Sequence, residues 1–447
     1  MEGTVAAIIK SSRFFSGGFN SVLVTGLFVV IMFGLANGSL ILSGQENIPV
    51  YINIWLNNTA GEDSWGAMGL AYEWLITNNG LLYQEILFNQ AIKFQYPPTS
   101  LLLFAAASAG DVTEPEETFN YIGRGFVLVD IMAVAALALL YARRIKLSAG
   151  QQVLLAAIAA FACLTFYPVL KAYALGQIQT WINAWFALAC LCWATDRKAA
   201  AGILIGAICL IKPQFSLFLI WGGLRRQWAF LAGWLSIVIP GVATSVAMFG
   251  LPNHLDYLSA LEFFARHGEA FYPNQSVNGL LNRLLENGNN LEWISDRFAP
   301  FNPLVYAGTL ISSIAMLLFA LLGHTRKRPV TLFDFISAGL IFTLASPIAW
   351  EHHYGIMPPA FVALYFAIQK LPRSGFRTLY WLCLATAHML AAHYLTFTKT
   401  FAATPLNFLQ SYLFFGALTV VWLLNTVPDP DVIKPPQRLV GSLPVEG

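Results

Sequence analysis

The feature that most constrains this chain is a succession of long apolar runs separated by short polar stretches. Most runs have roughly the 20 residues that a helix needs to cross the hydrocarbon core of a bilayer. Only 11% of the 447 residues are charged, whereas soluble domains carry about 25%. Because lipid chains cannot form hydrogen bonds with backbone N–H and C=O groups, each spanning run must be helical. We therefore predict an all-α, polytopic integral membrane protein.

Counting the runs gives about twelve expected transmembrane helices. They lie near residues 20–43, 98–110, 122–142, 152–170, 178–195, 200–222, 228–249, 303–323, 331–348, 355–369, 376–396 and 407–425. They predict a single membrane domain over residues 20–425, between a cytoplasmic N-terminus (1–19) and a disordered cytoplasmic tail (426–447). Two large polar loops, at about 44–97 and 250–302, interrupt this domain.

Lysine and arginine in short loops predict which face of a cell membrane is cytoplasmic. The clusters of this kind are Lys10 with Arg13, Arg225-Arg226, Arg326-Lys327-Arg328, and Lys370 with Arg373 and Arg377. They place both large loops and residues 351–353 on the outer face. Simple crossings between residues 100 and 225 would, however, put the cations at 143–146 and 197–198 outside. A re-entrant hairpin at Lys212-Pro213 would keep them inside, although we favour simple crossings.

Charge and cysteine content exclude several classes of protein. The net charge is only +2 and no basic run resembles a nucleic-acid-binding arm, so we expect no nucleic acid partner. All five cysteines lie in apolar runs, where they are expected to be small core side chains. The motifs of P-loop nucleotidases, zinc proteases and Rossmann enzymes do not occur. We therefore predict neither a metal nor another cofactor.

Glu62 and Asp63 form a pair of carboxylates in the first large loop. A carboxylate at the membrane boundary can act as a general base that takes the proton of an acceptor hydroxyl. The alternative is a solvated loop charge or the N-cap of a following helix. In the same loop, Tyr96 precedes Pro97-Pro98, which fixes the return of the chain to the membrane. Tyr96 is also a candidate to face a sugar.

Lys212 lies far inside the apolar run 200–222. A cation there is costly unless it faces a cavity or an anion, and a lipid-linked phosphate is one such anion. The alternatives are a lysine at the turn of a helical hairpin and one that snorkels to the interface.

Glu351-His352-His353 follows Trp350 at the end of an expected span. Adjacent histidines on a helix point about 100° apart and are a poor chelating pair. They could instead neutralise a phosphate leaving group or orient a base. The alternative is an interfacial belt of aromatic and polar residues.

Taken in order, the motifs of the chain form a longer pattern. They are Asp63, Tyr72, Gly80–Tyr83, Tyr96–Pro98, Gly176-Gln177, Lys212-Pro213, Asn274–Ser276 and Ser346–His353. This order resembles that of the polyprenyl-phosphate-mannose-dependent α-(1,2)-mannosyltransferase-like family (glycosyltransferase family 87). That family belongs to the C-type (GT-C) superfamily of glycosyltransferases.

The resemblance implies a GT-C-like membrane enzyme that transfers a hexose, with mannose expected, from a polyprenyl-phosphate donor to a glycan or glycolipid acceptor. Transfer would take place at the outer face and would invert the anomeric centre. The expected catalytic residues are Asp63 as base, with His352 and His353 assisting at the phosphate or the base. The expected substrate-binding residues are Glu62, Tyr72, Tyr96, Gln177, Lys212, Asn274 and Glu351.

One departure from the family's pattern matters for the base. The sequence around the acidic residue is Gly61-Glu62-Asp63-Ser64-Trp65, whereas the family usually has aspartate followed by aliphatic residues and tyrosine. Glu62 therefore competes with Asp63 for the role.

Two rival functions remain. A transporter or flippase of a lipid-linked or anionic solute would also have many spans, broken helices and charges within the membrane. Polarity gathered in the loops and the lack of repeated halves favour an enzyme. A non-catalytic scaffold would tolerate loss of Asp63 and the two histidines.

Overall fold

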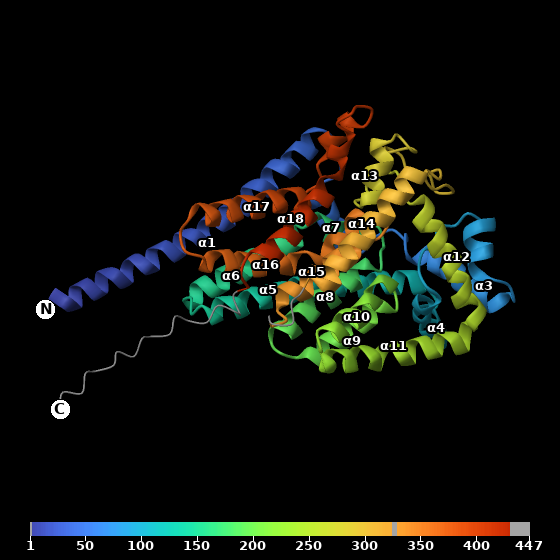
Figure 1. Cartoon of the computed structure of the whole chain (residues 1–447), viewed down its shortest axis with the longest axis horizontal. Coiled ribbons are helices and arrows are strands. Elements are labelled where there is room, and N and C mark those ends of the chain that lie inside the picture. The colour runs from blue at the N-terminus through green and yellow to red at the C-terminus, as the bar shows by residue number, and fades with distance from the viewer. Residues whose placement is uncertain (1, 324–328, 430–447) are drawn as a thin grey trace.

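The computed structural model describes residues 2–323 and 329–429, with side chains described from residue 22 onward. Its regular elements are helices, and the described part of the chain contains only one isolated β-bridge, between Asn274 and Trp350. The predicted all-α class is therefore confirmed (Figure 1). The cationic stretch 324–328 and residues 430–447 of the expected tail lie outside the described residues.

The elements follow one another without long interruptions. The first half contains α1 (Glu2–Leu42), α2 (Ile48–Asn57), α3 (Trp65–Thr77), the π-helical turn η1 (Gln84–Asn89), the 3-10 turn η2 (Pro98–Leu101), α4 (Leu102–Ala109), α5 (Pro115–Arg144), α6 (Ala149–Leu164), α7 (Tyr167–Ala174), α8 (Gln179–Ala194) and α9 (Lys198–Cys209). The second half contains the 3-10 turn η3 (Pro213–Ser216), α10 (Leu217–Leu224), α11 (Trp228–Phe249), α12 (Leu251–His267), α13 (Val277–Leu284), α14 (Pro303–Leu322), α15 (Leu332–Leu344), the 3-10 turn η4 (Glu351–Ile356), α16 (Pro358–Lys370), α17 (Gly375–Ala392), the 3-10 turns η5 (Thr396–Phe401) and η6 (Asn407–Ser411), and α18 (Tyr412–Thr426).

Among the described residues, five helical segments are long and apolar enough to cross a membrane. They are residues 22–42 of α1, α5, α11, α14 and the η6–α18 segment, and the pair α6 and α7, bent by 47°, raises the number to six. Other expected spans are shorter: 98–110 consists of η2 and α4, and 331–348 contains the 13-residue α15. The structure supports a multi-pass membrane protein, while the total of twelve spans stays a prediction.

The expected single crossing over 200–222 is a helical hairpin. α9 ends before Lys212, and α10 returns toward the residues from which α9 started, because Gly202 and Trp221 both lie against Phe230 of α11. Pro213 has no backbone N–H with which to continue α9. This hairpin matches the re-entrant alternative, whereas the sequence analysis favours a simple crossing.

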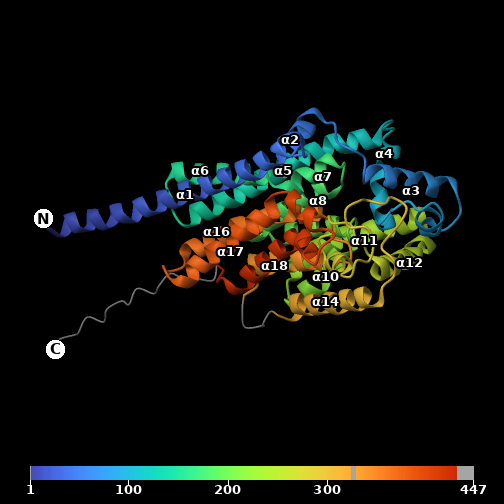
Figure 2. The ribbon, with the colours of Figure 1, turned by 90° about the horizontal axis from the view of Figure 1, so that it is seen from above.

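The hairpin brings the cationic loops to one end of the bundle. Arg144, at the end of α5, donates a hydrogen bond to the carbonyl of Ala194 at the end of α8. Tyr141 stacks on Phe366 near the end of α16, with the ring centroids 5.5 Å apart. We call this end, which carries the cations at 143–146, 197–198, 225–226 and 370–377, the basic end. The helices α3 and α12 lie together at the other end of the molecule in both views (Figures 1 and 2).

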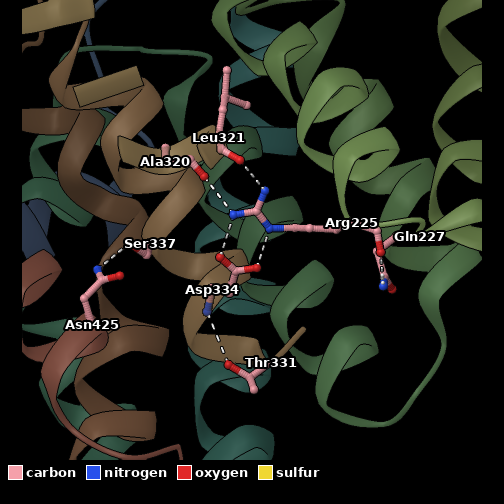
Figure 3. A network of polar contacts seen from close by, with 8 residues as sticks. All are labelled: Arg225, Gln227, Ala320, Leu321, Thr331, Asp334, Ser337 and Asn425. Carbon is pink, nitrogen blue, oxygen red and sulfur yellow. Dashed lines mark hydrogen bonds and ion pairs between the residues drawn. The ribbon is translucent and has the colours of Figure 1, made fainter. Parts of the chain in front are cut away.

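A buried ion pair ties three helices together at the basic end (Figure 3). The Arg225 guanidinium, which follows α10, donates to both carboxylate oxygens of Asp334 in the first turn of α15, at 2.6 and 3.0 Å. It also donates to the carbonyls of Ala320 and Leu321 near the end of α14, at 2.8 and 3.1 Å. Arg225 therefore has a structural role in addition to marking the orientation of the chain.

We predict that Asp334→Ala lowers stability by about 3 kcal/mol, because removing one partner leaves the buried guanidinium unpaired. Thermal unfolding of the purified protein in detergent measures the effect. The control is Asp196→Asn, whose carboxylate is 93% exposed and lies 3.8 Å from Lys198. It is expected to change stability by less than about 0.5 kcal/mol. Equal effects of the two variants would contradict the structural role.

Candidate active site

A cavity of about 800 Å³ lies at the end of the bundle opposite Arg225. Its walls come from both large loops, from the α7–α8 connection, from the turn between α9 and α10, and from residues 346–353. Seven of the predicted site residues line it: Asp63, Tyr96, Gln177, Lys212, and, in η4, Glu351 with the histidine pair His352 and His353. The structure thus gathers residues that are up to 290 positions apart in the sequence.

The backbone around Asp63 is held by direct pairing with the chain that follows α7. The N–H groups of Gly61, Asp63 and Ser64 donate to the carbonyls of residues 174, 175 and 176, at 3.0, 2.9 and 3.1 Å. Gly176 has φ +72°, and a Cβ atom there would lie 1.8 Å from the Gly61 carbonyl oxygen. This close approach is the physical reason for glycine in the Gly176-Gln177 pair.

The Asp63 carboxylate sits in a small hydrogen-bond network. The Gln177 side-chain amide donates to it. The side-chain oxygen of Gln177 accepts hydrogen bonds from the Ser64 hydroxyl at 2.6 Å and from the Tyr96 hydroxyl at 3.0 Å. The sequence analysis did not predict Ser64 as a site residue, because a serine at this position looks like an ordinary helix N-cap.

Asp63 remains open to the cavity although protein surrounds it. This burial raises the pKa of Asp63 above its ordinary value, while the hydrogen bond from Gln177 and the charge of Lys171 act in the opposite direction. A carboxylate with a raised pKa is a stronger base, which is the property that proton abstraction requires.

Three residues of the cavity lining each have a buried polar atom that makes no hydrogen bond within the described part of the chain. Lys212 is 7% exposed, and its Nζ makes no hydrogen bond to any described residue. The same holds for His352 Nε2 and His353 Nδ1. Burial without a counter-charge disfavours the charged form of the Lys212 amine, and an anion bound beside it would favour the ammonium.

The two histidines lie in the connection between α15 and α16, with ring centroids 4.7 Å apart and planes at 85°. Burial is the main cause that lowers the pKa of each ring, and the charge of Lys212 adds to it. Both are therefore neutral at pH 7, so each can donate a hydrogen bond without bringing a second charge next to Lys212.

Glu351 lines the cavity but is already hydrogen-bonded. Its oxygens accept from the hydroxyls of Tyr167 and Tyr412, at 2.9 and 3.2 Å. Burial raises the pKa of Glu351, and the charge of Lys171 opposes this rise. The two tyrosines hold the carboxylate in place beside the histidines.

Asn274 lies behind the cavity wall rather than in it. Its amide nitrogen donates to the carbonyls of Glu269 and Pro347, at 2.8 and 3.1 Å, and its oxygen accepts from the Ala349 N–H at 2.9 Å. This fully used side chain fastens the second loop to residues 347–350. The position of Asn274 supports a structural role.

Glu62 and Tyr72 are not among the residues that line this cavity. Glu62 is exposed. Tyr72, on α3, packs against Phe104 and Phe249, with centroids 6.1 and 6.3 Å apart. The geometry thus separates Asp63 from Glu62, which the sequence left as competitors.

Several cavity residues were missed by the sequence analysis. Lys93 lines the cavity and forms a 2.8 Å ion pair with Glu269, which lies outside the lining, and this pair joins the two large loops. Lys93 also lies 3.7 Å from the ring centroid of Trp293. Lys171 and Lys399 add further positive charge to the lining. Lys171 lies in α7 and Lys399 in η5, and a single lysine in a helix or loop carries no spacing signal that would identify it as a site residue. Within the described chain, no group of three or more His, Cys, Asp or Glu side chains is arranged to hold a metal ion.

A helical membrane protein with a carboxylate and several cations around one end cavity has the features of a membrane-embedded glycosyltransferase. The chain belongs to glycosyltransferase family 87, whose sequence model matches residues 94–347, more than half of the chain. The match covers Tyr96, Gln177 and Lys212, and it begins after Asp63 and ends before Glu351. No curated protein and no solved structure matches the chain.

We predict that Gly176→Ala disrupts the site, because the added Cβ collides with the Gly61 carbonyl and the positive φ costs at least about 1 kcal/mol. The melting temperature and glycosyl transfer should both fall. Gly125→Ala is the control, since a Cβ there meets nothing within 4 Å. If Gly176→Ala behaved like this control, the close packing of these two segments would not be needed.

Proposed function

We propose that this glycosyltransferase moves a hexose, with mannose as the expected sugar, from a polyprenyl-phosphate donor to a glycan or glycolipid acceptor. The observation that carries the proposal is the buried amino group of Lys212, which has no partner among the described residues and belongs to a residue that lines the same cavity as Asp63. A buried cation without a counter-charge suits the phosphate of a lipid-linked sugar. A carboxylate in the same cavity suits an acceptor hydroxyl.

In the proposed reaction, Asp63 accepts the proton of the acceptor hydroxyl as the hydroxyl oxygen forms a bond to the anomeric carbon. The bond between this carbon and the phosphate oxygen breaks, and the polyprenyl phosphate leaves with the electron pair. Lys212 offsets the negative charge that grows on the leaving phosphate, and the unpartnered nitrogens of His352 and His353 donate hydrogen bonds to the phosphate oxygens. A single displacement of this kind inverts the anomeric centre.

Gln177 and Tyr96 prepare Asp63 rather than react. The Gln177 amide supports the carboxylate, and its own carbonyl is fixed by Ser64 and Tyr96. A base whose position is fixed before substrate binds loses less entropy in the reaction. Tyr96 also lines the cavity and is a candidate sugar contact.

We further propose that the cavity opens at the outer face of a cell membrane. The cationic loops gather at the basic end, and the excess of lysine and arginine in short loops is typical of the cytoplasmic side. Because the cavity lies at the opposite end, it would face the outer side, where polyprenyl-phosphate sugars could reach it from the membrane.

The first test is transfer of radiolabelled mannose from polyprenyl phosphate to glycolipid acceptors in vesicles that contain the purified protein. Asp63→Asn is expected to lower the rate by about 10²- to 10⁴-fold, because the amide cannot take the proton. Glu62→Gln, one residue away and outside the cavity lining, is the matched control and should retain the wild-type rate.

Each other outcome decides against part of the proposal. Loss of transfer in Glu62→Gln alone would move the base by one residue. Full activity in both variants would place the base elsewhere. Absence of transfer by the wild-type protein from every polyprenyl-phosphate hexose, together with movement of the labelled lipid across the membrane, would favour a transporter.

The pH dependence tests the environment of Asp63. Because the base must be deprotonated, the rate should rise with pH through the raised pKa of Asp63, and its acid limb should lie above the ordinary value of about 4. Lys171→Gln removes a charge that lowers this pKa, so the limb should move to higher pH. Lys399→Gln, which removes a cavity cation that does not act on Asp63, should leave the limb in place. An unchanged limb in Lys171→Gln would contradict the assignment.

A further inference from the structure

A second hollow, of about 1480 Å³, lies between α1, α6, α16 and α17. Most of its lining is apolar and includes Phe28 of α1, Leu155 and Ile158 of α6, and Trp381 of α17. It is separate from the candidate active site, whose lining shares no residue with it. We call it the lateral groove.

One end of the lateral groove is strongly basic. Lys146, Lys370, Arg373 and Arg377 line it, whereas none of its lining residues is an aspartate or a glutamate. Arg377 is held there because its guanidinium donates to the Leu371 carbonyl at 3.0 Å and to the Gln369 side chain at 3.2 Å. These cations come from the α5–α6 and α16–α17 connections, which are distant in the sequence.

We propose that the lateral groove binds an anionic phospholipid, with its phosphate at the four cations and its acyl chains along the apolar wall. The combination of a long apolar surface with cations at one end only is complementary to a lipid with a negative headgroup. A zwitterionic lipid would fill the apolar wall equally well, but its own positive group would weaken the attraction to the cations.

The lipid proposed for the lateral groove is a different molecule from the proposed sugar donor. Glu351, His352 and His353 lie before the start of α16, while Lys370 ends it. Because α16 has 13 residues, about 20 Å separates the two groups. A donor whose phosphate sits beside Lys212 and the histidines cannot also place that phosphate at the basic end. Phospholipid binding is therefore independent of the sugar chemistry.

The groove also explains how α1 is attached. This helix contacts the bundle at few points, among them Phe28, whose ring lies 6.3 Å from that of His388 on α17, and Gly26, which faces Ile158 on α6. On either side of these two positions, Val24, Thr25 and Val29 line the groove. A bound lipid would fill the space between α1 and α16–α17 and would stabilise the folded protein by mass action.

The test is native mass spectrometry of the purified full-length protein in non-ionic detergent, titrated with dioleoylphosphatidylglycerol or dioleoylphosphatidylcholine. Wild type is expected to retain phosphatidylglycerol more strongly. The double variant Lys146→Gln/Arg373→Gln should weaken this binding about 25-fold, since each basic residue near an anionic headgroup contributes roughly a factor of five. The control double variant Arg197→Gln/Arg226→Gln removes two exposed cations of the basic end that lie outside the groove, and it should bind like wild type.

A second variant leaves all four cations in place. Ala162→Phe narrows the apolar wall and should also weaken phosphatidylglycerol binding. Equal binding of the two lipids by wild type, or unchanged phosphatidylglycerol binding in both groove variants, would overturn the proposal. Displacement of phosphatidylglycerol by polyprenyl phosphate would assign the groove to the donor instead. None of these readouts depends on sugar transfer, so failure of the proposed function would leave the result interpretable.

Discussion

The candidate site depends on the close approach of two backbone segments, 61–64 and 174–177. Three hydrogen bonds join them, and Gly176 allows a separation at which any side chain would collide with Gly61. This contact holds Asp63 at the cavity and places Gln177 where it can support the carboxylate. If this loop were not held after the first long helix, the Asp63 carboxylate would occupy many positions. Ordering it for the reaction would then cost conformational entropy.

The second requirement is a cation that the protein itself leaves unpaired. At the basic end, Arg225 donates four hydrogen bonds, two to Asp334 and two to carbonyls, and it therefore stabilises the fold. At the opposite end, Lys212 is equally buried but has no partner among the described side chains. The hairpin of α9 and α10 connects the two positions. The contrast indicates that one cation serves the structure and the other awaits an anion from outside.

Much of this arrangement could be predicted from the sequence, because its signals are local. The apolar runs predict the all-α fold class. The spaced motifs predict Asp63, Tyr96, Gln177 and the residues of η4 as site residues. The hairpin at Lys212 was harder to predict, since an apolar run of spanning length does not reveal whether proline divides it. Contacts between the loops, such as Lys93 with Glu269, depend on the packed fold and have no sequence signature. Asn274 matched a motif, but its amide proved to fasten the wall of the cavity.

The most direct test of the account is a cryo-electron microscopy structure of the protein with a polyprenyl phosphonate analogue of the sugar donor, which cannot be cleaved. The account predicts that the phosphonate lies within hydrogen-bond distance of Lys212 Nζ and of at least one nitrogen of His352 or His353. The sugar should then point toward Asp63. A phosphonate bound at Lys93 or Lys399 instead, with Lys212 still unpaired, would contradict the proposed roles of both Lys212 and Asp63.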